Sequence, residues 1–508
     1  MDETPVWTRR EFAAMGGAVG AAAMTSAGWG QSVGGANATE LVEIDLRRET
    51  GKLDHIWSRV MGSDRAAITM REPWRKDLER FKNEAGLRRV RFHGIFNDEL
   101  GVGANGNFQN VNAVYDGLLN RGVQPFVELS FMPRALASGK KEFGFYKANV
   151  NPPTSTDKWS ELVEKFVSHL VQRYGLSEVR QWYFEVWNEP NLTSWFWTGT
   201  QEEYFALYKA SAHAVKTVDP ALRIGGPATS AIQWIPQFLD YCERTNSPVD
   251  FVSTHIYPGD DQAMIFGQAA KYKEYDVVPA GVALARKQID ATRFKGTELW
   301  LNEWSSDSPA MIAHAITQSL PHCHAMGQWQ ISGEYEENMV ANWVFKEGQN
   351  GWGMLARGSV PKPEFNTYKL LNRLGDRKLA AKGPTLASTR DGGKFSALVW
   401  NLADVQQAPG IPGASRDRRV TGTRKTMIVR MRGAQAGQQV QVTYVDQERG
   451  SPYPAWRAMG SPQYPTREQM DIIRKSAELA APELRTLNGR GEITLDLPAE
   501  GVALIEAV

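Results

Sequence analysis

The chain has 508 residues, of which 42% are hydrophobic, so it is long enough for a large catalytic domain and a smaller second domain. Its 58 basic and 57 acidic residues give a formal net charge of +1, which offers no overall electrostatic reason to bind nucleic acid or an anionic membrane. Two cysteines, Cys242 and Cys323, cannot form a disulfide framework, and we expect both to be small buried hydrophobic residues.

Residues 1–38 have the pattern of an export signal. Arg9-Arg10 is followed by a weakly apolar run over residues 13–27, rich in glycine and alanine, which resembles a twin-arginine signal. This run is too short and too rich in glycine to anchor the chain stably in a membrane. We therefore expect export to the periplasm and no membrane anchor. The alternative is a disordered N-terminus with a chance arginine pair.

Residues 50–378 alternate short apolar segments with helical patterns, which predicts a (β/α)₈ TIM barrel. An amphipathic helix is expected over residues 159–174, because Leu162, Phe166 and Leu170 recur at helical spacing. A similar helix is expected over residues 202–218. The eight expected strands cover residues 56–61, 90–92, 124–129, 182–186, 223–224, 251–254, 298–301 and 328–332.

Two of these strands end in a glutamate. The aromatic run over residues 182–187 stops at Asn188-Glu189-Pro190, where proline ends the pairing, and a second strand ends in Asn302-Glu303-Trp304. Barrel enzymes hold their catalytic groups at the carboxyl ends of the strands. Either glutamate alone is more simply a solvated residue, but the repeated pattern favours a catalytic pair.

One reaction that a pair of carboxylates can catalyse is cleavage of a glycosidic bond, which needs a protonated acid and a second carboxylate that attacks or stabilises the sugar carbon. Glu189 and Glu303 lie on the fourth and seventh expected strands, which face each other across a barrel mouth. A retaining enzyme needs about 5 to 5.5 Å between the two carboxyl groups, and this position allows it. Burial among tryptophans would raise the pKa of Glu189, and hydrogen bonds from Tyr257 and His255 would keep Glu303 ionised.

Residues 379–508 change to β-strand patterns separated by turns, which predicts an accessory β-sandwich. One helix interrupts this region over residues 467–479, with Thr466 as its N-cap. The expected strands cover residues 395–401, 426–431, 439–445 and 492–497.

The strand that ends in Trp187-Asn188-Glu189-Pro190 resembles the fourth barrel strand of the clan A glycoside hydrolases. From about residue 40 to the C-terminus the chain resembles glycoside hydrolase family 39, which contains β-xylosidases and α-L-iduronidases. The β-xylosidase branch is suggested by an ordered series of motifs: Arg91-Phe92-His93-Gly94, residues 125–133 (PFVELSFMP), Gly225-Gly226-Pro227-Ala228, residues 250–255 (DFVSTH) and Pro361-Lys362-Pro363.

This resemblance implies a general acid/base role for Glu189 and a nucleophilic role for Glu303. It also implies that residues 39–49 form a strand that joins the β-sandwich. The sequence departs from the family pattern at Gly333, where β-xylosidases usually carry Asp, and at Gly327-Gln328, which replaces Ser-Tyr. The residues expected to contact the sugar, by resemblance or by their place at strand ends, are Asn188, His93, His255, Tyr257, Phe131, Trp329, Glu336 and Glu337.

The implied function is retaining hydrolysis of terminal β-D-xylosyl residues from xylo-oligosaccharides, without cofactor or metal. His322-Cys323-His324 does not predict a metal site, because side chains two residues apart on a helix do not face one another. Another sugar specificity is left open, namely that of an α-L-arabinosidase, an iduronidase-like enzyme or an exopolysaccharide hydrolase. A non-catalytic carbohydrate-binding envelope protein is the alternative from another class. Homo-oligomerisation is also left open.

Overall fold

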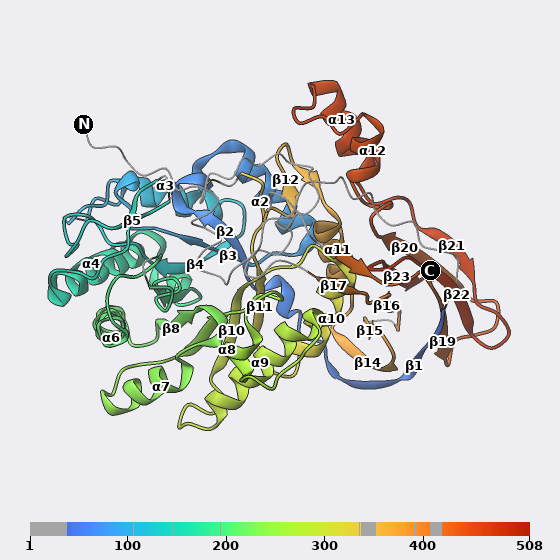
Figure 1. Cartoon of the computed structure of the whole chain (residues 1–508), viewed down its shortest axis with the longest axis horizontal. Helices are drawn as coiled ribbons and strands as arrows, with labels where there is room; N and C mark the ends of the chain where they lie inside the picture. The colour runs from blue at the N-terminus through green and yellow to red at the C-terminus, as the bar shows by residue number, and fades with distance from the viewer. Residues whose placement is uncertain are drawn as a thin grey trace. The chain divides into compact units, whose positions relative to one another are not determined.

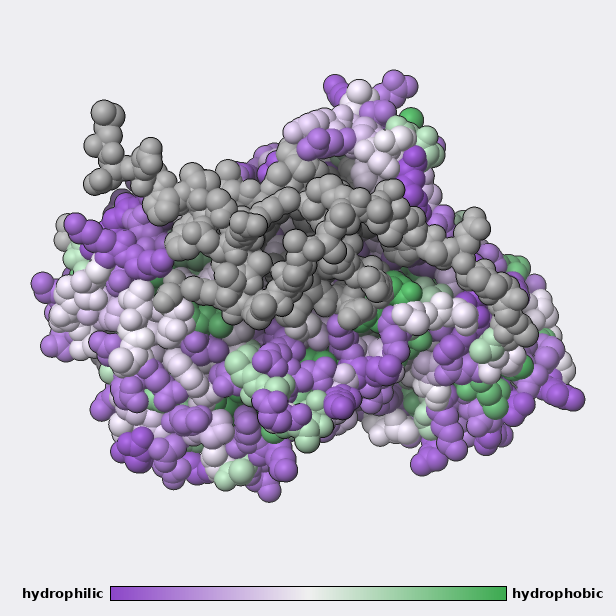
Figure 2. Space-filling view, viewed as in Figure 1, coloured by the Kyte–Doolittle hydropathy of each residue, from purple (hydrophilic) through white to green (hydrophobic). Residues whose placement is uncertain are grey.

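A computed structural model describes residues 38–104, 106–144, 146–193, 195–334, 336, 352–390, 393–406 and 419–508. Residues 1–37, which contain nearly all of the predicted export signal, and Glu337 lie outside this part of the chain. Within it, no helix has both the length and the apolar character that a membrane crossing requires. Hydrophilic residues predominate on the described part of the face in Figure 2, and hydrophobic residues occur there in small separate groups.

Eight parallel strands form the first sheet, in the order β2-β3-β4-β7-β8-β9-β10-β11 (Figure 1). The backbone N–H of Ile331, just beyond the last strand, donates to the carbonyl of Gly62 in the first strand at 3.1 Å and so closes the ring. This arrangement confirms the predicted TIM barrel. The strands are β2 (Met61–Arg65), β3 (Arg89–His93), β4 (Gln124–Leu129), β7 (Tyr183–Val186), β8 (Arg223–Thr229), β9 (Phe251–His255), β10 (Glu298–Trp304) and β11 (Ala325–Gln328).

A major helix follows each barrel strand. In α4 the buried residues include Leu162, Phe166 and Leu170, the apolar face that the sequence predicted, and the Ser155 side chain caps the helix by accepting from the backbone N–H of Lys158. The helices are α2 (Glu72–Ala85), α3 (Gln109–Leu119), α4 (Thr156–Tyr174), α6 (Gln201–Val218), α7 (Ile235–Arg244), α9 (Glu274–Asp290), α10 (Pro309–Ser319) and α11 (Pro363–Asn372).

The predictions for the first and the eighth strand are wrong in position. Residues 56–58 of the predicted first strand form the buried 3₁₀ helix η1 (Ile56–Ser58), and the strand begins only at Met61. A short apolar run has the same pattern in a buried strand and in a buried helical turn, so periodicity does not separate them. The eighth strand ends at Gln328, where the predicted strand begins.

Nine strands form a second sheet, in the order β21-β20-β23-β16-β15-β14-β1-β19-β22. The long strand β1 (Ala38–Lys52) pairs in parallel with β19 and antiparallel with β14. Apolar side chains from both halves of the sheet, such as Val429 and Val442, share one buried core, so the sheet folds over itself as a β-sandwich. The other strands are β14 (Arg377–Lys382), β15 (Thr385–Thr389), β16 (Phe395–Trp400), β19 (Lys425–Arg432), β20 (Gln439–Val445), β21 (Glu483–Thr486), β22 (Glu492–Leu497) and β23 (Val502–Ala507).

Two helices, α12 (Tyr453–Ala458) and α13 (Arg467–Ser476), lie between β20 and β21 in the chain. Helix α13 begins after the predicted N-cap Thr466 but ends at Ser476 rather than at residue 479. Shorter elements are η2 (Ala66–Met70), η3 (Asp98–Leu100), β5 (Glu142–Phe143), β6 (Ala148–Asn149), α5 (Leu176–Val179), η4 (Ser230–Ile232), α8 (Gln262–Phe266), β12 (Leu355–Ala356), β13 (Val360–Pro361), β17 (Asp404–Gln406) and β18 (Arg419–Thr421).

Candidate active site

The backbone turns sharply where β7 ends. Trp187 and Glu189 both have left-handed conformations, with φ values of 70° and 42°. Such conformations cost about 1 to 3 kcal/mol each for residues other than glycine, so the surroundings must hold them in place. The Trp187 indole N–H donates to the carbonyl of Phe196 at 2.6 Å, and the Glu189 backbone N–H donates to Ala228 at 2.8 Å. This turn places Glu189 at the barrel mouth.

The two predicted glutamates meet there. One carboxylate oxygen of Glu189, one of Glu303 and a ring nitrogen of His255 all lie within 4.8 Å of one another. Both glutamates are 6% exposed, so the pair is almost shielded from solvent. Their donor atoms could also hold a metal ion, but the guanidinium of Arg91 contacts Glu303 at 3.2 Å, and its positive charge opposes a cation at this point.

Glu303 accepts hydrogen bonds on both carboxylate oxygens. The Tyr257 hydroxyl donates to Oε1 at 2.7 Å, and Arg91 donates to Oε2 at 3.2 Å. The Nδ1 atom of His255 lies 3.5 Å from the same Oε2 but forms its hydrogen bond with Glu189, so the prediction that His255 is a donor to Glu303 is wrong. The hydrogen bonds from Tyr257 and Arg91 stabilise a negative charge on Glu303 and fix its carboxylate in one orientation.

Glu189 has a different environment. Its Oε1 atom lies 3.0 Å from Nδ1 of His255. Burial raises the pKa of Glu189 to about 7, against the opposing effects of His93, a hydrogen bond from Ser230 and the charge of Arg91. Burial also lowers the pKa of His255 to about 4, so this imidazole is neutral at physiological pH. Glu189, which exchanges its proton near neutral pH, therefore faces Glu303, whose carboxylate is bound by Arg91 and Tyr257.

A buried ion cluster below the pair was missed in the sequence. Arg91 is fully buried and contacts Glu128 at 2.8 Å, Glu185 at 2.6 Å and Glu303 at 3.2 Å. Burial alone would lower the pKa of Arg91, but the charges of the three glutamates outweigh it and raise that pKa. The available signal was the single glutamate in each of the apolar runs over residues 125–129 and 183–186, since charged side chains are almost never fully buried unless paired.

Two of the predicted sugar-contact residues, Trp329 and Phe131, pack against a third, His93. Its ring packs against Trp329 with 4.7 Å between ring centroids, and its Nδ1 atom lies 2.8 Å from Glu128. Phe131 packs behind His93 and has no exposed surface. Asn188, next to Glu189, accepts a hydrogen bond from Arg91 at 2.9 Å and is thereby fixed in orientation.

Glu336 lies at the edge of the mouth, in contact with two arginines rather than with the glutamate pair. Arg65 donates to its carboxylate at 3.1 Å and Arg71 at 3.0 Å. Arg65 also pairs with Glu99 at 2.9 Å. The neighbouring Glu337 lies outside the described residues.

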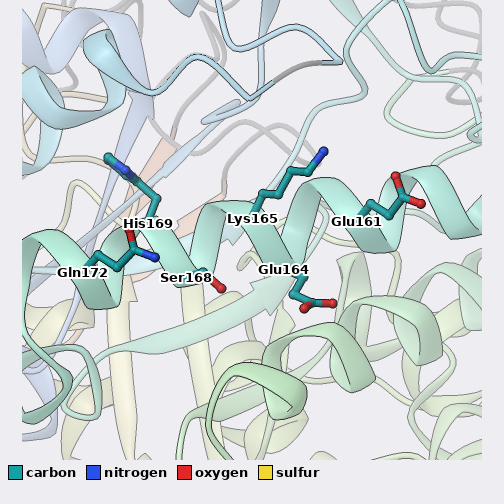
Figure 3. Close-up of a pocket in the computed structure, with 6 residues that line it drawn as sticks. All are labelled: Glu161, Glu164, Lys165, Ser168, His169 and Gln172. Atoms are coloured by element: carbon teal, nitrogen blue, oxygen red, sulfur yellow. The ribbon is translucent and has the colours of Figure 1, made fainter.

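A separate hollow of about 340 Å³ lies on the outer side of α4. Its lining side chains all belong to this one helix and point in different directions (Figure 3). They include Glu161, Lys165 and His169, which are exposed or partly exposed polar groups. Because these groups do not converge, the hollow lacks the features of a catalytic site.

Comparison with known proteins agrees with the geometry of the barrel mouth. Residues 40–494 match the family described as glycosyl hydrolases family 39. A β-xylosidase of Caldicellulosiruptor saccharolyticus is 34% identical over 90% of this chain and 95% of its own length, and a β-xylosidase of Geobacillus stearothermophilus is 29% identical over 89% and 92%. The crystal structure of a monomeric β-xylosidase from Caulobacter crescentus is 31% identical, with a TM-score of 0.80 over 92% of this chain and 99% of that one. The chain therefore belongs to glycosyl hydrolase family 39 and is an O-glycosyl hydrolase.

Proposed function

We propose that this protein is a retaining β-xylosidase that removes terminal β-D-xylosyl residues from xylo-oligosaccharides. The approach of the Glu189 and Glu303 carboxylates to within 4.8 Å carries the proposal. Inverting glycosidases hold their carboxyl groups about 6.5 to 9.5 Å apart, to leave room for a water molecule between carboxylate and sugar. The β-xylosidase relatives support xylose as the sugar.

In the proposed first step, a Glu303 oxygen attacks the anomeric carbon while protonated Glu189 gives its proton to the departing glycosidic oxygen. The alcohol leaves, and xylose is bound to Glu303 through an ester. In the second step, ionised Glu189 takes a proton from water, whose oxygen attacks the same carbon and releases Glu303. Two inversions give net retention. The pKa of about 7 suits Glu189 to both halves of this cycle.

Sugar recognition is assigned to the polar and aromatic groups around the pair. We assign to Asn188, beside the acid, a hydrogen bond to a hydroxyl next to the anomeric carbon, and to His93 and Trp329 one wall of the sugar site. A neutral sugar is favoured over a uronic acid, because Arg65 and Arg71 at the mouth are both paired with Glu336. An iduronidase-like specificity needs a cation directed at the sugar carboxylate.

Aryl glycosides test the proposal directly. Aryl β-D-xylosides should be cleaved faster than aryl α-L-arabinosides, and proton NMR should show β-xylose as the first product. First appearance of α-xylose would contradict retention, and turnover of another aryl glycoside alone would contradict the sugar assignment.

Two variants test the roles of the glutamates. Glu303→Ala should abolish turnover of every substrate. Glu189→Ala should lose about 10² to 10⁴ in rate with poor leaving groups, because they depend on protonation, and much less with activated ones. Equal losses with both classes of leaving group would contradict the acid role.

We also propose export through the segment around Arg9-Arg10. Cell fractionation of the full chain and of an R9K/R10K variant tests it. The proposal requires the parent in the periplasm and the variant in the cytoplasm, and identical distributions would contradict it.

A further inference from the structure

Glu185 lies inside the barrel, on β7, one layer below the catalytic pair. The residue is completely buried, and both of its carboxylate oxygens are occupied. Oε2 accepts from the Nε atom of Arg91 at 2.6 Å, and Oε1 accepts from the amide nitrogen of Asn302 at 2.5 Å. Glu185 therefore contacts neither solvent nor the mouth, but it binds two residues that do border the reacting groups.

Both partners of Glu185, Arg91 and Asn302, contact or adjoin the proposed catalytic residues. Arg91 reaches Oε2 of Glu303 with one terminal nitrogen and Oδ1 of Asn188 with the other, at 3.2 and 2.9 Å. Asn302 directly precedes Glu303 on β10. Because a guanidinium is planar and rigid, fixing its Nε atom also fixes the directions of its terminal nitrogens. The single carboxylate of Glu185 thus orients contacts to the nucleophile and to the residue beside the acid.

Charge gives Glu185 a second effect on Arg91. Three buried carboxylates, those of Glu128, Glu185 and Glu303, share this one guanidinium. If the charge of Glu185 were removed, Arg91 would be drawn more strongly to the remaining two. A tighter contact with Glu303 would hold the nucleophile away from the sugar and make its oxygen less ready to attack.

We propose that Glu185 is a positioning residue for the hydrolysis reaction, which holds Arg91 and Asn302 so that Glu303 keeps its reactive position. This inference rests on the proposed nucleophilic role of Glu303. Glu185 acts through its two partners, and we expect it to contribute to the rate rather than to substrate binding.

Glu185→Gln is the direct test. The amide removes the negative charge, and when its oxygen accepts from Arg91 its NH₂ group faces Asn302, whose own amide must turn over to offer Oδ1 as an acceptor. We expect kcat to fall by about 10²-fold, the size of effect that a small misplacement of reacting groups produces, while KM changes less than about threefold. The loss should be equal for activated and poor leaving groups, because nucleophilic attack is impaired in both cases.

Glu298→Gln is the matched control. Glu298 begins β10 at the opposite end of the barrel, where it accepts from the hydroxyl of Tyr183 at 3.1 Å and the indole of Trp300 at 2.9 Å. We expect its kcat to stay within about threefold of the parent, because the amide oxygen of Gln can still accept from both donors and position 298 lies away from the catalytic pair. Three results would overturn the inference: an unchanged kcat in a folded Glu185→Gln protein, a loss confined to poor leaving groups, or an equal loss in Glu298→Gln.

Asn302→Ala covers the case in which Glu185→Gln does not fold. It removes one anchor of Glu185 and leaves every charge of the cluster in place. We expect kcat to fall about tenfold, again with KM and the leaving-group dependence unchanged, as suits the loss of one hydrogen bond to a charged group. An unchanged kcat in this variant would overturn the inference.

Different results would contradict the positioning role of Glu185 and the proposed sugar specificity. If the parent protein cleaves no aryl β-xyloside but does cleave another aryl glycoside, the proposed specificity is wrong. The ratios of variant to parent kcat are then measured on that glycoside. Equal loss for both classes of leaving group would still support the positioning role, and no loss would exclude it.

Discussion

Glu189 gains and loses its proton near neutral pH, because burial raises its pKa to about 7. A general acid must be protonated in the free enzyme, so kcat/KM for a poor leaving group should fall as the pH rises through about 7. The pH profile of phenyl β-xyloside hydrolysis measures this. In Glu189→Gln the residual activity on an activated xyloside should show no decline over this range. An identical decline in the variant would assign the titration to another group.

The hydroxyl of Tyr257 donates a hydrogen bond to Oε1 of Glu303 at 2.7 Å. A hydrogen bond to a charged group contributes about 1.5 to 3 kcal/mol, so Tyr257→Phe should lower kcat about tenfold to a hundredfold. Tyr183→Phe is the control, because its hydroxyl contacts Glu298 at the opposite end of the barrel. Steady-state kinetics of both variants on one aryl xyloside would decide. Similar losses in both would point to a general effect on the barrel.

The sequence predicts the positions of some site residues but not the contacts of others. Glu189 and Glu303 stand out in the sequence, because each interrupts an aromatic strand at its carboxyl end, and the structure brings them together. The partners of Arg91 could not be predicted in the same way. Its contacts depend on which side chains of β4, β7 and β10 reach the barrel axis at one height, and the pattern within one strand does not contain that information.

Among the barrel strands, those with conventional apolar sequences lie where they were predicted, and two atypical strands do not. In the second sheet, strands β14, β15, β21 and β23 were not predicted. Strand β2 reads Met-Gly-Ser-Asp-Arg, and its polar side chains are buried because they find partners, such as the Ser63 hydroxyl that accepts from Trp74 at 2.8 Å. Strand β11 contains Gly327, where an added Cβ atom would lie 3.0 Å from the carbonyl oxygen of Asn302. Tertiary contacts overrode strand propensity in both.

Helix α13 provides a test of a local prediction. Thr466 accepts from the backbone N–H of Gln469, whose side chain in turn accepts from the backbone N–H of Thr466. Losing this cap should lower the free energy of unfolding by about 1 kcal/mol in Thr466→Ala, without a change in kcat/KM. Thr466→Ser keeps the hydroxyl and should retain the stability. Denaturant unfolding curves of the two variants provide the comparison, and equal losses would contradict the capping role.

In the whole molecule, several polar contacts join the barrel helices to the part of the chain that carries the second sheet. Glu478, just after α13, pairs with Arg80 of α2 at 2.8 Å and with Lys369 of α11 at 3.3 Å. The backbone N–H of Ala310 in α10 donates to the carbonyl of Glu500 at 3.1 Å. Both fold types were predictable from strand and helix periodicity. These contacts were not, because they join residues far apart in the chain.

Asn366 tests whether this junction makes the molecule unfold as one unit. From α11, its amide nitrogen donates to the carbonyls of Gly450 at 2.9 Å and Ala477 at 2.7 Å, in a fully buried position. Asn366→Ala leaves buried acceptors without this donor, so it should lower the free energy of unfolding by about 2 to 5 kcal/mol. As a control, the exposed Asn83→Ala should change the free energy of unfolding by less than about 0.5 kcal/mol.

Calorimetry tests whether the two sheets unfold together. It should show one transition in the parent and one transition at lower temperature in Asn366→Ala, because the ion pairs of Glu478 still join the two parts in the variant. Two separate transitions in the parent, or an unchanged midpoint in Asn366→Ala, would contradict a single cooperative unit.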